Sequence, residues 1–250
     1  MSSVLAGAEP FSAAGGPNGV LVLHGFTGNP QSMRGLAEAF AAAGYSVELP
    51  LLPGHGTSID DMLETGWSDW SGAAELAFCE LESRCEKVVV AGLSMGGTLA
   101  TWLAARHTEV AGLVAVNPAV EPAGEAFADI LKMTLEQGTA VMPAIGNDVA
   151  DPDQRELAYD GVPVAPLLTL IEAQTELSSL LADIVCPTLL VTSRNDHVVP
   201  PSNSDYLAER VRGPVERVFL DRSFHVATLD YDRADIESRA VAFANQVTSV

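Results

Sequence analysis

The segment Gly92-Leu93-Ser94-Met95-Gly96 holds a serine in a setting that suits a nucleophile. The apolar run Val88-Val89-Val90 precedes it, and an Ala/Leu-rich stretch follows it. A strand that turns into a helix at a serine between two glycines is the pattern of a nucleophile elbow. Such a turn strains the serine backbone and lifts its hydroxyl clear, and a Cβ at Gly92 or Gly96 would collide where strand and helix pack closely. The sequence therefore predicts that Ser94 is a catalytic nucleophile.

A serine hydroxyl needs a base within hydrogen-bond reach, and that base needs an orienting acid. His225 follows the last predicted strand, and Asp196 follows the strand before it, in the chain order Ser, Asp, His that this kind of elbow uses. We assign His225 as the general base and Asp196 as the acid. Asp221 is the rival for the acid, and the structural alternative for Asp196 is an Asx turn or a helix cap before Val198.

The other histidines have different expected places. His107 ends the elbow helix, away from the expected site, and His24 begins a glycine-rich loop, where we expect it to hold the backbone. His55 lies in a Pro/Gly loop, where it either lines the pocket or serves the fold. His197 is adjacent to Asp196, so its side chain is expected to point away from that carboxylate.

The negative charge of a tetrahedral intermediate requires main-chain N–H donors, each worth about 3 kcal/mol. The N–H of Met95 is predicted to be one donor, because it follows the nucleophile at the start of a helix. Phe26, in the loop Gly25-Phe26-Thr27-Gly28, is predicted to supply the second. The alternative for this loop is a simple tight turn. A phosphate-binding loop is disfavoured because no Gly-Lys-Ser/Thr sequence follows.

These loops require a sheet whose strands end at one edge. Helical patterns alternate with short apolar runs, a rhythm that predicts an α/β fold with a mostly parallel sheet and helices on both faces. The predicted strands are Gly19–Leu23, Tyr45–Leu49, Lys87–Ala91, Gly112–Val116, Pro187–Thr192 and Val215–Leu220.

The alternation stops at Asn117-Pro118. Between residues 118 and 185 the sequence shows two helical patterns and no convincing strand. We predict a core domain of residues 1–117 and 186–250, with residues 118–185 inserted as a helical cap over the carboxyl ends of the strands. The alternative is extra helices packed elsewhere on the sheet. An acyl-chain tunnel in the cap would use some of Phe127, Ile130, Leu131, Leu135, Leu167, Leu168 and Leu170.

The composition excludes several classes of partner. The net charge of −20 repels nucleic acid and anionic membrane surfaces. The three cysteines have no metal-site spacing and an odd count, so buried, unpaired thiols are expected. No apolar run is long enough to span a bilayer, and the first ten residues show no leader pattern, so a cytoplasmic protein is expected.

Four stretches together resemble the bacterial monoacylglycerol lipases and their carboxylesterase relatives, a family of the α/β-hydrolase superfamily. They are His24-Gly25-Phe26-Thr27-Gly28, Gly92-Leu93-Ser94-Met95-Gly96-Gly97, Asn195-Asp196-His197-Val198-Val199-Pro200 and Phe224-His225-Val226-Ala227-Thr228-Leu229-Asp230-Tyr231-Asp232. The resemblance implies hydrolysis of a glycerol monoester without a cofactor or metal. It implies the same roles for Ser94, Asp196 and His225, with Phe26 and Met95 as the oxyanion hole.

The resemblance extends into the predicted cap. The stretches Ala144–Asp148 and Arg155–Tyr159 are similar to the part of the family that lines the glycerol end of the pocket, which makes Ile145 and Glu156 candidate substrate-binding residues. A solvated carboxylate is the alternative for Glu156. A carboxylesterase for simple short- to medium-chain esters is the alternative function. The expected partner is a small lipid ester, with transient contact between the cap and a membrane or micelle left open, and with a monomer or a homodimer.

Overall fold

The computed structural model describes residues 2–249, so the predicted outer limits of the core at residues 1 and 250 lie outside the described part. Its main sheet has seven strands in the order β1-β3-β2-β4-β5-β8-β9. All neighbouring strands run parallel except β1, which pairs antiparallel with β3 at one edge. The strands are β1 Phe11–Ala13, β2 Asn18–Leu23, β3 Ser46–Leu49, β4 Lys87–Leu93, β5 Val110–Val116, β8 Thr188–Ser193 and β9 Val215–Leu220.

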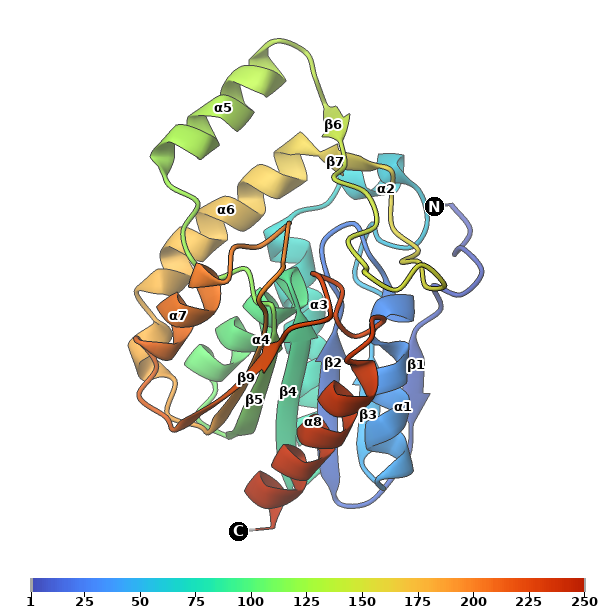
Figure 1. Cartoon of the computed structure of the whole chain (residues 1–250), viewed down its shortest axis with the longest axis vertical. Coiled ribbons are helices and arrows are strands. Elements are labelled where there is room, and N and C mark those ends of the chain that lie inside the picture. Colours follow the sequence, from blue (N-terminus) through green and yellow to red (C-terminus); the bar gives the residue numbers. More distant parts are fainter. Residues whose placement is uncertain (1, 250) are drawn as a thin grey trace.

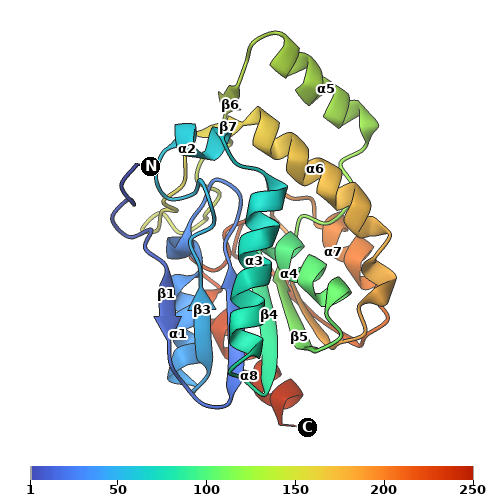
Figure 2. The ribbon, with the colours of Figure 1, turned by 180° about the vertical axis from the view of Figure 1, so that it is seen from behind.

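Helices cover both faces of this sheet. Helices α1 (Arg34–Ala42) and α8 (Arg233–Thr248) pack side by side on one face (Figure 1). Helices α3 (Trp67–Glu82) and α4 (Met95–Arg106) cover the other face (Figure 2). The short helix α7 (Ser202–Ala208) follows β8. These positions confirm the predicted α/β architecture, which is the α/β-hydrolase fold.

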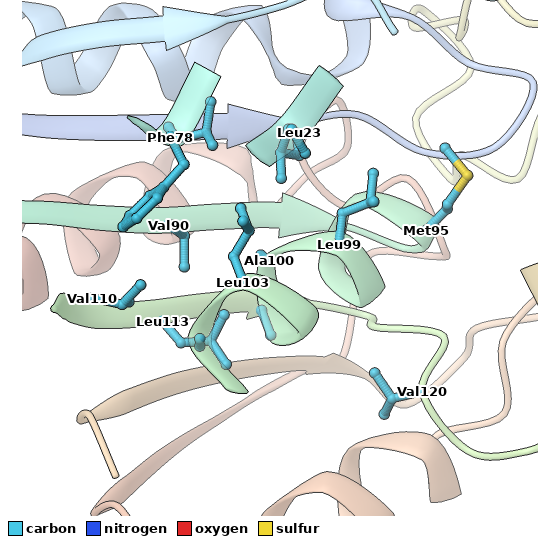
Figure 3. Close-up of a cluster of buried hydrophobic side chains, with 14 of the residues drawn as sticks. Leu23, Phe78, Val90, Met95, Leu99, Ala100, Leu103, Val110, Leu113 and Val120 are labelled. Carbon is cyan, nitrogen blue, oxygen red and sulfur yellow. The ribbon is translucent and has the colours of Figure 1, made fainter. Parts of the chain in front are cut away.

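The sheet divides the apolar core into two layers, because successive side chains of a strand point to opposite faces. Leu21, Leu23 and Val90 face α3 and α4, where they meet Phe78, Leu99 and Leu103 (Figure 3). Val20, Val22 and Val89 face α1 and α8, where they meet Phe40 and Phe243. The central strands β2, β4, β5 and β8 are therefore buried on both sides, which explains why they read as continuous apolar runs, whereas the edge strands β1 and β9 are partly exposed.

In the segment between β5 and β8, the part from α5 (Glu125–Glu136) to β7 (Gly161–Pro163) lies beyond the carboxyl ends of the strands, and α6 (Val164–Ser178) runs from there down toward α4 (Figure 1). The segment also contains the 3-10 turn η2 (Leu181–Asp183). The expectation of no strand in this segment is wrong, because β6 (Val141–Pro143) and β7 (Gly161–Pro163) form a two-stranded antiparallel pair. Each strand has three residues and carries a proline, so neither shows a readable alternation.

Two short elements precede the elbow. The 3-10 turn η1 (Pro30–Met33) leads into α1, and α2 (Ile59–Leu63) lies in the loop after β3. The hydroxyl of Ser58 caps α2 by accepting the N–H of Asp61 at 3.2 Å. The three cysteines are unpaired, but only Cys186 is buried and Cys79 is exposed, so the expectation of buried thiols is wrong at Cys79. Within residues 2–249, no helix has the length and apolarity needed to cross a membrane.

Candidate active site

Ser94 stands at a strained turn between β4 and α4. Its φ of 56° and ψ of −120° are an unfavourable backbone conformation for a residue with a side chain. A Cβ on Gly92 would lie 2.0 Å from the carbonyl oxygen of Gly96, and a Cβ on Gly96 would lie 2.1 Å from that of Leu23. Both glycines are thus sterically required, as the sequence predicts, and the turn carries Ser94 to the carboxyl end of the sheet.

His225 and Asp196 meet after the last two strands. The Nδ1 atom of His225 lies 2.8 Å from Oδ2 of Asp196, and both side chains are buried. The other oxygen, Oδ1, accepts the main-chain N–H groups of Val198 and Val199, each at 2.8 Å. The Asx turn and the contact with histidine, two alternatives for Asp196 at the level of sequence, therefore hold together, one on each carboxylate oxygen.

The rival acid lies elsewhere. Asp221 forms an ion pair with Arg194 at 3.1 Å, and its side chain is 78% exposed. Among the described residues, it forms no hydrogen bond or ion pair with His225. The position of Asp221 removes it as a partner for the imidazole.

Ser94 and His225 line the same pocket. No hydrogen bond joins the Ser94 hydroxyl to the imidazole within residues 2–249. Such contacts are often long before substrate binds and tighten in the reacting complex. Because Nδ1 of His225 faces Asp196, Nε2 on the other side of the ring is the nitrogen that is left for a partner in the pocket.

The remaining histidines serve the fold. His24 is fully buried, with Nδ1 3.0 Å from the carbonyl of Gly25 while Nε2 accepts the N–H of Leu52 at 3.1 Å. This confirms that it holds backbone. Burial, and then repulsion from His55, lower its pKa well below the usual value. His55 does not line the pocket; it packs between His24 and Trp70, and burial lowers its pKa to about 4.

The imidazoles of His107 and His197 each contact a carboxylate. The Nε2 atom of His107 lies 2.9 Å from Glu75, away from the pocket. The Nδ1 atom of His197 lies 2.7 Å from Oδ1 of Asp148, so its ring points away from Asp196, as expected.

Of the two predicted anion donors, Phe26 lines the pocket and Met95 directly follows Ser94, which is part of the lining. Met95 is the first residue of α4 and is buried, and Phe26 lines the pocket beside Gly25. A Cβ on Gly25 would lie 3.5 Å from that of Ser94, so this loop passes close to the elbow. Within the described part of the chain, neither N–H is engaged in a hydrogen bond. Both donors are free to meet a ligand.

Residues 144–160, which connect β6 to β7, form the outer wall of the pocket and are called the strap below. Ile145 lies in it and is 69% exposed, at the rim. The carboxylate of Glu156 lies deeper, against the loop that carries Phe26, where a Cβ on Gly28 would approach its Oε1 to 2.7 Å. Burial raises the pKa of Glu156, while His225 and the hydroxyl of Ser32 partly offset the rise.

The predicted tunnel residues do not line this pocket. Leu131 packs against Val164 and Ile171, and Phe127 and Ile130 of α5 are exposed. The apolar face of α5 is thus divided between helix packing and solvent. Helical spacing in the sequence cannot show whether an apolar side chain packs against another helix, faces solvent or lines a pocket.

Two residues that hold the main chain of His225 were not predicted from the sequence. The N–H of His225 donates to Oδ2 of Asp148 at 3.0 Å, and its carbonyl accepts Nδ2 of Asn117 at 2.8 Å. Asn117 follows β5 with a φ of 43°, so an asparagine directly after a buried strand was an available signal. Asp148, in a segment without periodicity, offered none. No cluster of His, Cys, Asp and Glu within residues 2–249 is arranged to hold a metal ion.

Comparison with known proteins identifies the family and relatives of this chain. The family described as serine aminopeptidase, S33, matches residues 17–232. The chain is 45% identical over 96% of its length to a thermostable monoacylglycerol lipase of Bacillus sp. (strain H-257), covering 95% of that protein. It is 25% identical over 90% of its length to a carboxylesterase of Bacillus subtilis (strain 168), covering 91% of it.

A solved structure shows the same fold in detail. It comes from a study of LipS and LipT, two metagenome-derived lipolytic enzymes, and it superposes with a TM-score of 0.93 at 41% identity. The match covers 98% of this chain and all of the other. With the strained serine, the buried carboxylate–imidazole pair and these relatives together, the chain belongs to the serine aminopeptidase S33 family and is a serine hydrolase of the α/β-hydrolase fold.

Proposed function

We propose that the protein hydrolyses monoacylglycerols to a fatty acid and glycerol through an acyl-enzyme on Ser94. The observation that carries the chemistry is the pocket shared by Ser94 and His225, whose Nδ1 lies 2.8 Å from the buried carboxylate of Asp196. The substrate class is supported by the 45% identity to a monoacylglycerol lipase over nearly the whole chain.

The reaction proceeds by acylation and then deacylation of Ser94, and His225 and Asp196 serve both steps. Nε2 of His225 takes the proton of the Ser94 hydroxyl while Oγ attacks the ester carbonyl, and then gives that proton to the departing glycerol oxygen. Water next attacks the acyl-enzyme with His225 again as base, which releases the fatty acid and restores Ser94. Asp196 keeps the proton of the ring on Nδ1 and stabilises the imidazolium formed in each half.

The main-chain N–H groups of Phe26 and Met95 donate hydrogen bonds to the former carbonyl oxygen and stabilise its negative charge. Met95 begins α4, so the positive end of the helix dipole adds to its N–H. Two preorganised donors of this kind are worth about 3 kcal/mol each in the transition state. The free state of both N–H groups supports this assignment.

Glu156 and Ile145 are proposed to recognise the alcohol part of the ester. The Glu156 carboxylate lies against the Phe26 loop, within the electrostatic reach of His225, where it can accept a glycerol hydroxyl. Ile145 covers the rim of the same pocket from the strap. A carboxylate is a poor neighbour for an unsubstituted alkyl leaving group, so this placement favours a hydroxylated one.

A carboxylesterase acting on short- to medium-chain simple esters is the second candidate. It is supported by the similarity to the Bacillus subtilis carboxylesterase and by the absence of the predicted tunnel residues from the described pocket. Turnover of monolauroylglycerol, p-nitrophenyl butyrate and dilauroylglycerol, measured by fatty-acid release, separates the two. A monoacylglycerol lipase prefers the first ester and rejects the last; a clear preference for p-nitrophenyl butyrate selects the carboxylesterase.

Residues 118–185 act as the cap on a core formed by residues 1–117 and 186–250, and they give the lipid substrate its route of entry. The enzyme works in the cytoplasm without a cofactor. Size-exclusion chromatography with light scattering decides between a monomer and a homodimer.

A further inference from the structure

The strap contributes one buried carboxylate to the loops that carry the acid and the base. Oδ2 of Asp148 accepts the main-chain N–H of His225 at 3.0 Å and that of His197, the neighbour of Asp196, at 3.2 Å. Oδ1 lies 2.7 Å from Nδ1 of His197, and the carbonyl of Asp148 accepts the N–H of Val226 at 3.1 Å. One residue of the strap thus bridges the loop that carries Asp196 and the loop that carries His225.

A second carboxylate fixes the strap from the opposite direction. Asp230 is fully buried in the loop after His225, and its Oδ2 accepts the N–H of Ala150 at 2.7 Å and that of Phe224 at 2.9 Å. Its Oδ1 accepts the N–H of Asp151 at 3.0 Å. Asp148 and Asp230 are therefore reciprocal: each segment sends a carboxylate to the backbone of the other, on both sides of His225.

The main chain of the base is held at both of its polar groups. Asn117, at the end of a core strand, holds the carbonyl of His225, and Asp148 holds the N–H from the strap. Hydrogen bonds to a carboxylate are shorter and stronger than those between neutral groups. The core therefore holds the carbonyls of Phe224 and His225, whereas the N–H of His225 is held by the strap.

We propose that Asp148 is a positioning residue that sets the reach of His225 toward Ser94 and makes the strap a part of the catalytic apparatus. The proposal rests on the roles given above to Ser94, Asp196 and His225. Asp148 does not touch the reacting atoms in this account. Loss of its carboxylate leaves the buried N–H of His225 and the partly buried N–H of His197 without their acceptor. The His225 loop is then released, so proton transfer suffers while the other walls of the pocket remain.

The test compares Asp148→Ala, Asp148→Asn and Asp148→Glu in the full-length enzyme. The control is Asp153→Ala, which removes an equal charge from an exposed position of the strap outside the pocket lining. For each variant, kcat and KM are measured with monolauroylglycerol and with p-nitrophenyl butyrate. The rate of Ser94 labelling by a fluorophosphonate is measured per folded molecule, with folding followed by near-UV circular dichroism.

Asp148→Ala is expected to lower kcat for both esters by about 100-fold, the cost of misplacing a catalytic group by roughly 1 Å. KM is expected to change little, and the labelling rate should fall in parallel with kcat. Asp148→Asn keeps an oxygen acceptor for the two N–H groups and should recover most of the loss. If Asp148→Ala does not fold, Asp148→Glu carries the test, because it keeps the charge and moves the acceptor by one methylene, which again should lower kcat.

Three results would overturn the proposal. They are wild-type kcat in both Asp148→Ala and Asp148→Glu, a loss confined to KM for monolauroylglycerol, and an Asp148→Asn variant as impaired as Asp148→Ala. Activity in Ser94→Ala refutes the proposed function, whereas an inactive Ser94→Ala beside fully active Asp148 variants refutes only the role of Asp148.

Discussion

Nδ1 of His225 lies 2.8 Å from Oδ2 of Asp196, whose other oxygen is held by two main-chain N–H groups. Asp196→Asn keeps the shape but presents an amide to the ring, which favours the wrong tautomer of His225. We expect kcat for p-nitrophenyl butyrate to fall by about 10⁴-fold. Asp221→Asn is the matched control, because Asp221 pairs with Arg194 at the surface. If the Asp221 variant is the impaired one, the acid is misassigned.

The elbow depends on the absence of a side chain at Gly96. A Cβ there would lie 2.1 Å from the carbonyl oxygen of Leu23, and this contact is between backbones that cannot easily yield. We expect Gly96→Ala to lower the free energy of unfolding by about 3 kcal/mol or more and to abolish activity. Urea unfolding followed by tryptophan fluorescence measures the change.

Gly72 provides the matched control for this substitution. It lies in α3, where an added Cβ meets nothing within 4 Å. Gly72→Ala should raise the free energy of unfolding by about 0.5–1 kcal/mol, because glycine in a helix interior costs that much relative to alanine. Equal destabilisation in both variants would contradict the steric account of the elbow.

Glu156 is expected to serve the glycerol ester and not the simple one. Glu156→Gln keeps the size of the side chain and removes the charge that would accept a glycerol hydroxyl. We expect kcat/KM for monolauroylglycerol to fall by about tenfold, in line with a hydrogen bond to a charged group. The value for p-nitrophenyl butyrate should stay unchanged. An equal loss on both esters would assign Glu156 to the fold or to His225 instead.

Two buried histidines make the fold sensitive to mild acid. Burial lowers the pKa of His55 to about 4, and the pKa of His24 is also lowered well below its usual value. The unfolded chain therefore binds more protons than the folded protein between about pH 6.5 and 4. Their stabilising contribution is complete above pH 6.5 and is lost as the pH falls, by about 1.4 kcal/mol per pH unit for each proton.

The variant His55→Gln isolates one of these protons. The difference between the unfolding free energies of wild type and variant is expected to be constant at pH 7–8 and to shrink as the pH falls below about 6.5. Urea titrations at a series of pH values give this difference. A difference that does not change with pH would mean that His55 is not held neutral by burial.

The central sheet and the elbow could be predicted from the sequence because short local patterns of residues determine them. The strands next to β4 appear in the sequence as continuous apolar runs, because both faces of the sheet are covered by helices. The elbow is recognisable from Gly92 and Gly96 alone, because a side chain at either position would collide with the backbone. The partners Asp196 and His225 follow from the rule that strand ends meet at one edge. Their contact depends on topology that the alternation already indicates.

The conformation of the strap, which forms the outer wall of the pocket, could not be predicted from the sequence. The strap between β6 and β7 has no period, and its conformation is set by tertiary contacts such as that of Tyr159, whose hydroxyl accepts the N–H of Thr57 at 2.9 Å. Asp148 reaches backbone groups 49 and 77 residues away. Helical spacing in α5 identified an apolar face correctly, but spacing cannot say whether that face meets a pocket, another helix or solvent.

The central claim is that Ser94 is the nucleophile for a glycerol ester. The most direct measurement is fatty-acid release from monolauroylglycerol by the wild type and by Ser94→Ala at equal concentrations of folded enzyme. We predict that the variant loses activity by about 10⁶-fold, as expected when a nucleophile that acts together with its base is removed. Turnover of monolauroylglycerol by Ser94→Ala at the wild-type rate would contradict the account.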